Sequence, residues 1–171
     1  GVTAPDGEIY SFGSFMAADN PSMYPKRQIN TVWLEEAGLA MPTTLEEFTA
    51  ILEAFKARGG DTIPLGGSFV SDNPFGIILN AFGYIHNSDA NGKAPNLREG
   101  KVVIPAGDRE VYGEVLTLLH DYYAKGYIHP DFYTMDVTAQ RAVTAENRNG
   151  VIAQDAFLAL PEPEGFQQFV T

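Results

Sequence analysis

Two pairs of adjacent carboxylates could in principle act as the acid and base of a hydrolase: Glu35-Glu36 and Glu46-Glu47. A glycosidase needs an acid and a base that converge across the scissile bond and have separated pKa values. Both pairs instead sit side by side in first turns or on exposed faces of expected helices, where negative charge favours the N-terminal dipole. We therefore predict no catalytic residues.

The three histidines, His86, His120 and His129, are scattered over a turn, a helix and a loop. They lack the paired spacing that zinc ligands need, so no metal site is predicted. We expect His129, which precedes Pro130, to make a structural hydrogen bond. The nucleophile elbow, the P-loop and the dinucleotide-binding glycine pattern are also absent from the sequence.

Aromatic residues are plentiful, with 11 Phe, eight Tyr and one Trp. Sugar sites stack aromatic faces on C–H groups and satisfy hydroxyls with polar side chains. Ligands of α/β sheets bind beyond the carboxyl ends of strands. The ligand-binding candidates therefore follow expected strands: Phe12, Ser14, Phe69, Asp72, Asn73, Gln154 and Asp155. By contrast, helical spacing predicts a packing role for Trp33, Phe48, Phe55 and Phe82.

Composition excludes several classes of protein. A hydrophobic content of 44% is too high for a disordered chain. The net charge of −11 argues against a nucleic-acid partner, because phosphate binding needs clustered Lys and Arg. The absence of cysteine excludes disulfides, thiolate metal sites and cysteine nucleophiles. We expect neither a membrane span nor a signal peptide within these residues, since long apolar runs and a basic start before an apolar stretch are missing.

Start and stop signals predict the helices that must position these residues. Thr44 and Glu47 form a capping box before apolar residues at helical spacing, and Gly59-Gly60 ends that helix. A second long helix is predicted from Asp108, its N-cap, to Lys125, with Gly126 as the stop. Shorter helices are predicted over 30–37, 75–82 and 138–146.

Short strands are predicted over 8–12, 63–65, 101–104 and 151–153, and residues 87–100 are expected to be rich in turns. Because the strands alternate with helices, the predicted class is α/β. The length of 171 residues fits one domain, 1–171, with its own core.

Four segments, in order along the chain, resemble the extracellular solute-binding proteins of family 1, which serve bacterial ABC importers and include many sugar receptors. They are DGEIYSF at 6–12, WLEEAGL and MPTTLEEF at 33–48, YYAKGYIHPDF at 122–132, and ALPEPEG at 159–165. Together they span nearly the whole chain, and none of them is a catalytic motif.

The resemblance implies a periplasmic-binding-protein-like fold of class II. Residues 1–171 would form its second lobe, a small mixed sheet flanked by helices, with hinge crossings near 8–12 and 158–163. It adds Tyr84 to the ligand-binding candidates. It further implies a monomer outside the cytoplasm, a cell-surface lipoprotein or a periplasmic protein. Such a protein would pass a small polar ligand, expected to be a sugar or oligosaccharide, to ABC permease subunits.

Two departures from the family pattern bear on these expectations. The loop at 56–61, KARGGD, lacks the alternating oxygen donors of a calcium site, so neither calcium nor any cofactor is predicted. Residues 151–153 and 159–161 are also closer together than in the family. Either a piece is truly absent or a stretch has been closed up near Asp155-Ala156.

Two other functions stay open on the sequence. A carbohydrate-active enzyme domain would show paired carboxylates converging in a pocket. A surface interaction module would show an exposed apolar patch and no polar cleft.

Overall fold

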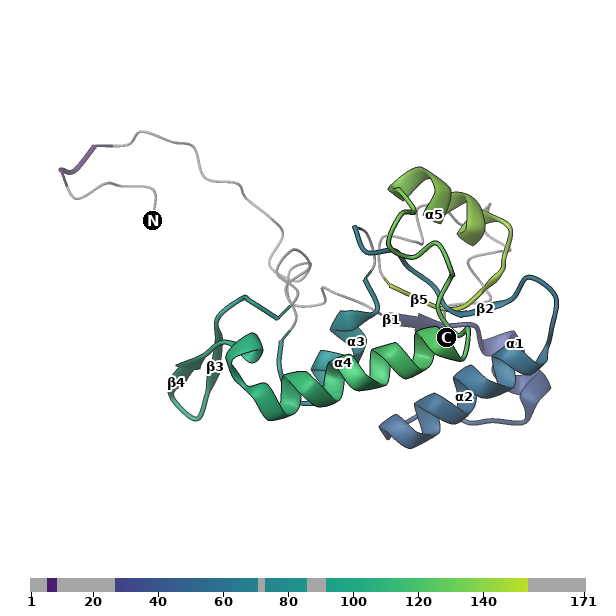
Figure 1. The fold of residues 1–171 in the computed structure, drawn as a ribbon, viewed down its shortest axis with the longest axis horizontal. Helices are drawn as coiled ribbons and strands as arrows, with labels where there is room; N and C mark the ends of the chain where they lie inside the picture. The colour runs from purple at the N-terminus through teal and green to yellow at the C-terminus, as the bar shows by residue number, and fades with distance from the viewer. Residues whose placement is uncertain (1–5, 9–26, 71–72, 86–91, 154–171) are drawn as a thin grey trace.

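A mixed three-stranded sheet lies at the centre of the fold (Figure 1). A computed structural model describes residues 6–8, 27–70, 73–85 and 92–153. The strands are β1 (Arg27–Ile29), β2 (Ile63–Leu65) and β5 (Asn149–Ala153), in the order β1-β5-β2. The central strand β5 is antiparallel to β1 and parallel to β2, so the small mixed sheet is confirmed. Beyond Glu8, the predicted strand at 8–12 and both hinge crossings lie outside the described residues.

Five α-helices accompany this sheet in the described part of the chain, and their bounds follow local capping. They are α1 (Thr31–Ala37), α2 (Leu45–Ala57), α3 (Phe75–Ala81), α4 (Arg109–Ala124) and α5 (Val137–Ala145). Side-chain oxygens of Asn30, Asp108 and Asp136 accept hydrogen bonds from the third backbone N–H after them, at 3.1, 3.3 and 2.8 Å. All the predicted helices are therefore confirmed to within about one residue at each end.

Strands β3 (Asn96–Arg98) and β4 (Lys101–Val103) form a separate hairpin beside the N-terminal end of α4 (Figure 1). Strand β3 lies inside the stretch 87–100 that was predicted to be rich in turns, and neither β3 nor β1 was predicted. Glu99 and Gly100 both have positive φ, 52° and 75°, which is the backbone of a two-residue hairpin turn. The turn's geometry sets the pairing of Arg98 with Lys101 and of Leu97 with Val102.

The core joins α2, the sheet and α4. Leu52, Phe55, Leu65 and Tyr122 are fully buried, and Val151 of the central strand is nearly so. The ring of Phe55 packs edge-on against Trp33, with the centroids 5.3 Å apart. The predicted packing roles of Trp33, Phe48 and Phe55 are confirmed, and half-buried Phe82 packs on the same core.

The first turn of α2 is held by the predicted capping box. The Thr44 hydroxyl accepts from the Glu47 N–H at 3.2 Å, and the Glu47 carboxylate accepts from the Thr44 N–H at 3.1 Å. Glu47 also accepts from the backbone N–H and the hydroxyl of Thr43, at 2.7 and 2.9 Å. These bonds, the Thr43 N–H first among them, lower the pKa of Glu47.

Replacing Thr44 by alanine should therefore lower the free energy of unfolding by about 1 kcal/mol, because an N–H at the helix start loses its partner. Thr117→Ala is the matched control, since the Thr117 hydroxyl only donates to the Gly113 carbonyl inside α4. Urea denaturation of both variants measures the difference. Equal losses in the two variants would show that the capping box is not what stabilises this end of α2.

Candidate functional site

A pocket of about 380 Å³ opens between α4, the segment 128–133 and the side chains of Phe69, Asn73 and Phe75. Aromatic and aliphatic side chains make up most of its lining, and several of them are exposed. Phe69 is 46% exposed and Tyr133 is 68% exposed. The lining residues are Phe69, Asn73, Phe75, Lys93, Tyr112, Leu116, Leu119, His120, Tyr123, Ile128, Phe132 and Tyr133.

Backbone bonds between two loops position the first side of this pocket. The chain leaving β2 runs beside the chain that follows α4, where Leu65 forms a parallel bridge with Ile128. The Phe69 N–H then donates to the Phe132 carbonyl at 2.9 Å. Asn73 closes this loop, because its amide donates to the Phe69 carbonyl at 3.3 Å and its oxygen accepts from the Phe75 N–H at 3.0 Å. Phe69 is thus held at the carboxyl end of β2.

The exposed rings form one continuous wall. The Phe69 and Tyr133 centroids are 5.9 Å apart, and those of Tyr133 and Tyr123 are 6.1 Å apart. Buried Phe132 supports Tyr133 edge-on at 4.9 Å. The Tyr123 hydroxyl donates to the Pro130 carbonyl at 2.7 Å, which fixes the ring. An exposed wall of this kind can stack on the C–H face of a sugar ring.

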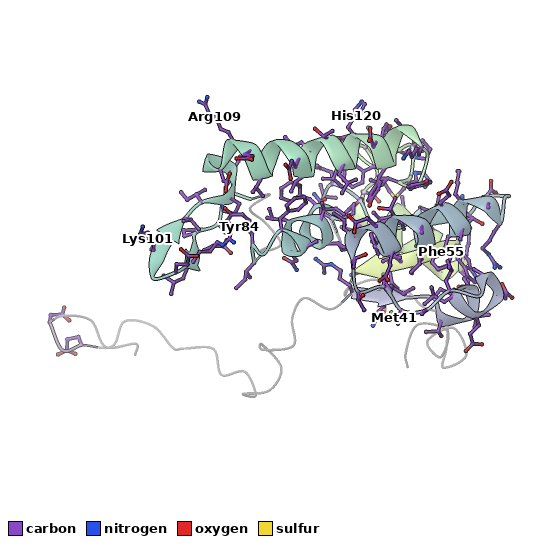
Figure 2. The ribbon with its side chains drawn as sticks, turned by 90° about the horizontal axis from the view of Figure 1, so that it is seen from below. Met41, Phe55, Tyr84, Lys101, Arg109 and His120 are labelled. Atoms are coloured by element: carbon purple, nitrogen blue, oxygen red, sulfur yellow. The ribbon has the colours of Figure 1, made fainter. Side chains whose placement is uncertain are left out.

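The described lining holds one cation, Lys93, and one imidazole, His120, and carboxylates are absent from it. His120 projects outward from α4 (Figure 2), and its Nδ1 lies 3.8 Å from Oδ1 of Asp121. The acidic pairs that suggested a hydrolase lie elsewhere: Glu36 is paired with Arg58, and Glu47 caps α2. The pocket therefore offers ring stacking and hydrogen bonds, and its described walls lack the converging carboxylates of a glycosidase.

The structure brings two of the predicted ligand-binding residues together, Phe69 and Asn73. Tyr84 lies apart from this pocket: it is 4% exposed, and the Arg98 guanidinium stands 4.6 Å over its ring. The other candidates, Phe12, Ser14, Asp72, Gln154 and Asp155, lie outside the described residues.

Sequence reasoning did not select the part of the lining that comes from α4 and from the loop after it. Tyr112, Leu116, Leu119 and Tyr123 recur at helical spacing and form a second stripe beside the buried one. That spacing was the available signal. Tyr133 had no comparable signal, because only its loop's contact with Phe69 brings it into the wall.

The Tyr84 hydroxyl donates to the Asp108 carboxylate at 2.7 Å, just before α4 begins. This bond is the main cause of a lowered pKa of Asp108, followed by the bond from the Val111 N–H. A carboxyl whose pKa is lowered in the folded state stabilises the fold above its unfolded pKa. That stabilisation is lost as the pH falls through the folded pKa.

Asp108→Asn should consequently lower the melting temperature at neutral pH, because the neutral amide keeps the cap but loses the charge. The deficit should shrink as the pH falls through the lowered pKa of Asp108, where the carboxyl itself becomes neutral. Melting curves across this range measure it. Tyr84→Phe should weaken the acid dependence as well, and a deficit that stays constant with pH would contradict this account.

His129 makes the expected structural bond, as its Nδ1 accepts from the Asp131 N–H at 3.1 Å, and burial lowers the pKa of its imidazole. The described residues include no cluster of three His, Asp or Glu side chains placed to hold a metal ion. Within the same ranges, every helix is too short or too polar to cross a bilayer.

Comparison with curated proteins gives a consistent answer. The chain is 31% identical to the fructooligosaccharide ABC transporter substrate-binding protein FusA of Streptococcus pneumoniae over 162 residues, 88% of this chain. It is 29% identical to lipoprotein LipO of Bacillus subtilis over 137 residues, 72% of this chain. The chain spans 29% and 25% of the lengths of these two relatives. The search against protein-family models found no match.

Solved structures agree with this fold. FusA of S. pneumoniae in complex with kestose matches with a TM-score of 0.72 at 29% identity, over 90% of this chain and 33% of that one. A solute-binding protein from Bifidobacterium longum infantis matches with a TM-score of 0.78 over 99% of this chain and 37% of that one. At 22% identity, this match supports a likeness of fold only. In sequence and fold the chain is thus similar to a portion of the substrate-binding proteins of ABC transporters, and its fold is periplasmic-binding-protein-like.

Proposed function

We propose that the chain belongs to an extracytoplasmic receptor of an ABC importer and helps to bind a sugar or oligosaccharide. One observation carries the proposal: 31% identity over 88% of the chain to a receptor named for fructooligosaccharides. The solved FusA structure holds kestose, which is a sugar of that class. In the full-length receptor, two lobes would close around the ligand by a hinge motion.

Within this lobe, the wall of Phe69, Tyr123 and Tyr133 would stack on sugar rings. Lys93, His120 and Asn73 would offer polar groups at its border. The candidates Phe12, Ser14, Asp72, Gln154 and Asp155 would add hydroxyl, amide and carboxylate partners. Tyr84 would act from behind this surface, since its hydroxyl anchors the start of α4 through Asp108.

The receptor would perform no chemistry on the sugar. It would act as a monomer, deliver its ligand to ABC permease subunits, and sit outside the cytoplasm as a cell-surface lipoprotein or a periplasmic protein. The name of LipO supports the lipoprotein form. The alternative of a carbohydrate-active enzyme gains no support from the pocket, because carboxylates are missing from its described lining.

Titration of the full-length receptor with fructooligosaccharides, kestose first, tests the proposal. A ligand at a hundred times its Kd should stabilise the receptor by about 2.7 kcal/mol, which a thermal shift detects. Release of reducing sugar in the same mixtures would reveal hydrolysis and overturn the transport role. The absence of any shift with fructans, other neutral oligosaccharides and peptides would count against a small-solute receptor.

A further inference from the structure

The β3–β4 hairpin turns an apolar face to solvent. Leu97 and Val102 are cross-strand partners, so they share a face, and they are 73% and 74% exposed. Ile104, two residues beyond Val102, lies on the same side by strand alternation and is 49% exposed.

The opposite face of the hairpin fixes this orientation. Asn96 is buried. Its side-chain oxygen accepts a hydrogen bond from the Ile85 N–H at 2.6 Å, and its side-chain amide donates to the Ile85 carbonyl at 3.1 Å. Val103 packs against the core, and Arg98 stacks on Tyr84. Asn96 of β3 therefore faces inward, while Leu97 next to it faces outward. A fixed apolar sheet face of this kind marks an interaction surface.

Charge around the patch differs from the rest of the chain. Residues 93–109 contain four of the chain's 11 basic residues, Lys93, Arg98, Lys101 and Arg109, but only two carboxylates, Glu99 and Asp108. The chain as a whole carries a net charge of −11. Figure 2 shows Lys101 on the hairpin and Arg109 at the nearby start of α4. The matching surface should thus offer apolar side chains, with carboxylates where it meets cations such as Lys101.

We propose that the hairpin face is an interface within the full-length receptor. The chain spans 29% of FusA and 33% of its solved chain, so a receptor of that length has ample polypeptide to cover the patch. The occupant is a carboxylate-bordered apolar surface from the part of the receptor outside residues 1–171. It covers Leu97, Val102 and Ile104, and this contact is independent of which solute the receptor binds.

A single introduced thiol tests the interface, because these 171 residues contain no cysteine. Val102→Cys is made in the full-length receptor, with any cysteine outside these residues changed to serine. Met41→Cys is the control, as Met41 is 52% exposed in the loop between α1 and α2, far from the hairpin (Figure 2). The thiol at position 102 should react with Ellman's reagent at least about tenfold more slowly than the control.

Equal rates at the two positions would overturn the proposal. So would a protection that grows with protein concentration, which would indicate self-association. Protection that appears only with phosphatidylglycerol vesicles would assign the patch to a lipid surface instead. As a second readout, Leu97→Ser should lower the melting temperature of the full-length receptor more than Met41→Ser does, while equal shifts would contradict the interface.

Discussion

Replacing Gly150 by alanine is expected to cost about 3 kcal/mol of folding free energy, the upper end of what overpacking a core usually costs. Gly150 lies in β5, the central strand of the sheet. A Cβ at this position would overlap the Phe55 ring, coming within 2.8 Å of its Cε2, and would lie 2.9 Å from the Pro64 carbonyl oxygen. Phe55 is fully buried against Trp33, and Pro64 belongs to the neighbouring strand β2, so neither can move aside easily.

Gly113→Ala provides the matched control. Gly113 lies inside α4, and a Cβ there would meet nothing within 4 Å. Because alanine is a better helix former than glycine, this variant should gain about 0.5–1 kcal/mol. Denaturant unfolding of the two glycine variants should therefore give opposite signs. A small loss for Gly150→Ala, similar in size to the gain at Gly113, would show that the sheet has room at this position.

A second substitution identifies the cause of the loss. Phe55→Leu is destabilising alone, but in the Gly150→Ala background it should restore part of the stability, because the overlapping ring is gone. The two sites are in contact, so a coupling of roughly 0.5–3 kcal/mol is expected. Strictly additive effects would show that Phe55 is not the obstacle.

The helices were predictable because their signals are local. Thr44 with Glu47, and Asp108 with Gly126, mark starts and stops within a few residues of the helix itself. Strand β1, by contrast, consists of Arg27, Gln28 and Ile29, which lack an alternating pattern and become a strand only by pairing with β5. Strand β3 is equally short, and its one local signal was the turn at Glu99-Gly100.

The candidate site shows the same division between local and distant signals. Phe69 and Asn73 were predicted because they follow a strand, a relation that is readable along the chain. Tyr123 lies on α4, and the apolar spacing of that helix is already explained by its buried residues Val115 and Tyr122. Only the packing of α4 beside the loop at 128–133 shows that its neighbouring stripe lines a pocket. Tyr84 illustrates the reverse case, since an aromatic after a helix can be used for anchoring as readily as for binding.

Phe69→Ala in the full-length receptor should weaken oligosaccharide binding by about tenfold or more, the usual scale for losing an aromatic anchor. The ring stands 5.9 Å from Tyr133 and forms the edge of the wall nearest the end of β2. Because Phe69 is 46% exposed, its removal should change the melting temperature of the unliganded receptor only slightly.

Val32→Ala is the control for this loss, since Val32 is a similarly exposed apolar residue, at 40%, on α1, and does not line the pocket. Calorimetric titration with the best-binding fructooligosaccharide should give an unchanged Kd for Val32→Ala and a raised Kd for Phe69→Ala. Tyr133→Ala should resemble Phe69→Ala, and the double variant should lose less than the sum because the two rings share one surface. Unchanged affinity in both single variants would remove the aromatic wall from the binding site, even if the receptor still binds sugar.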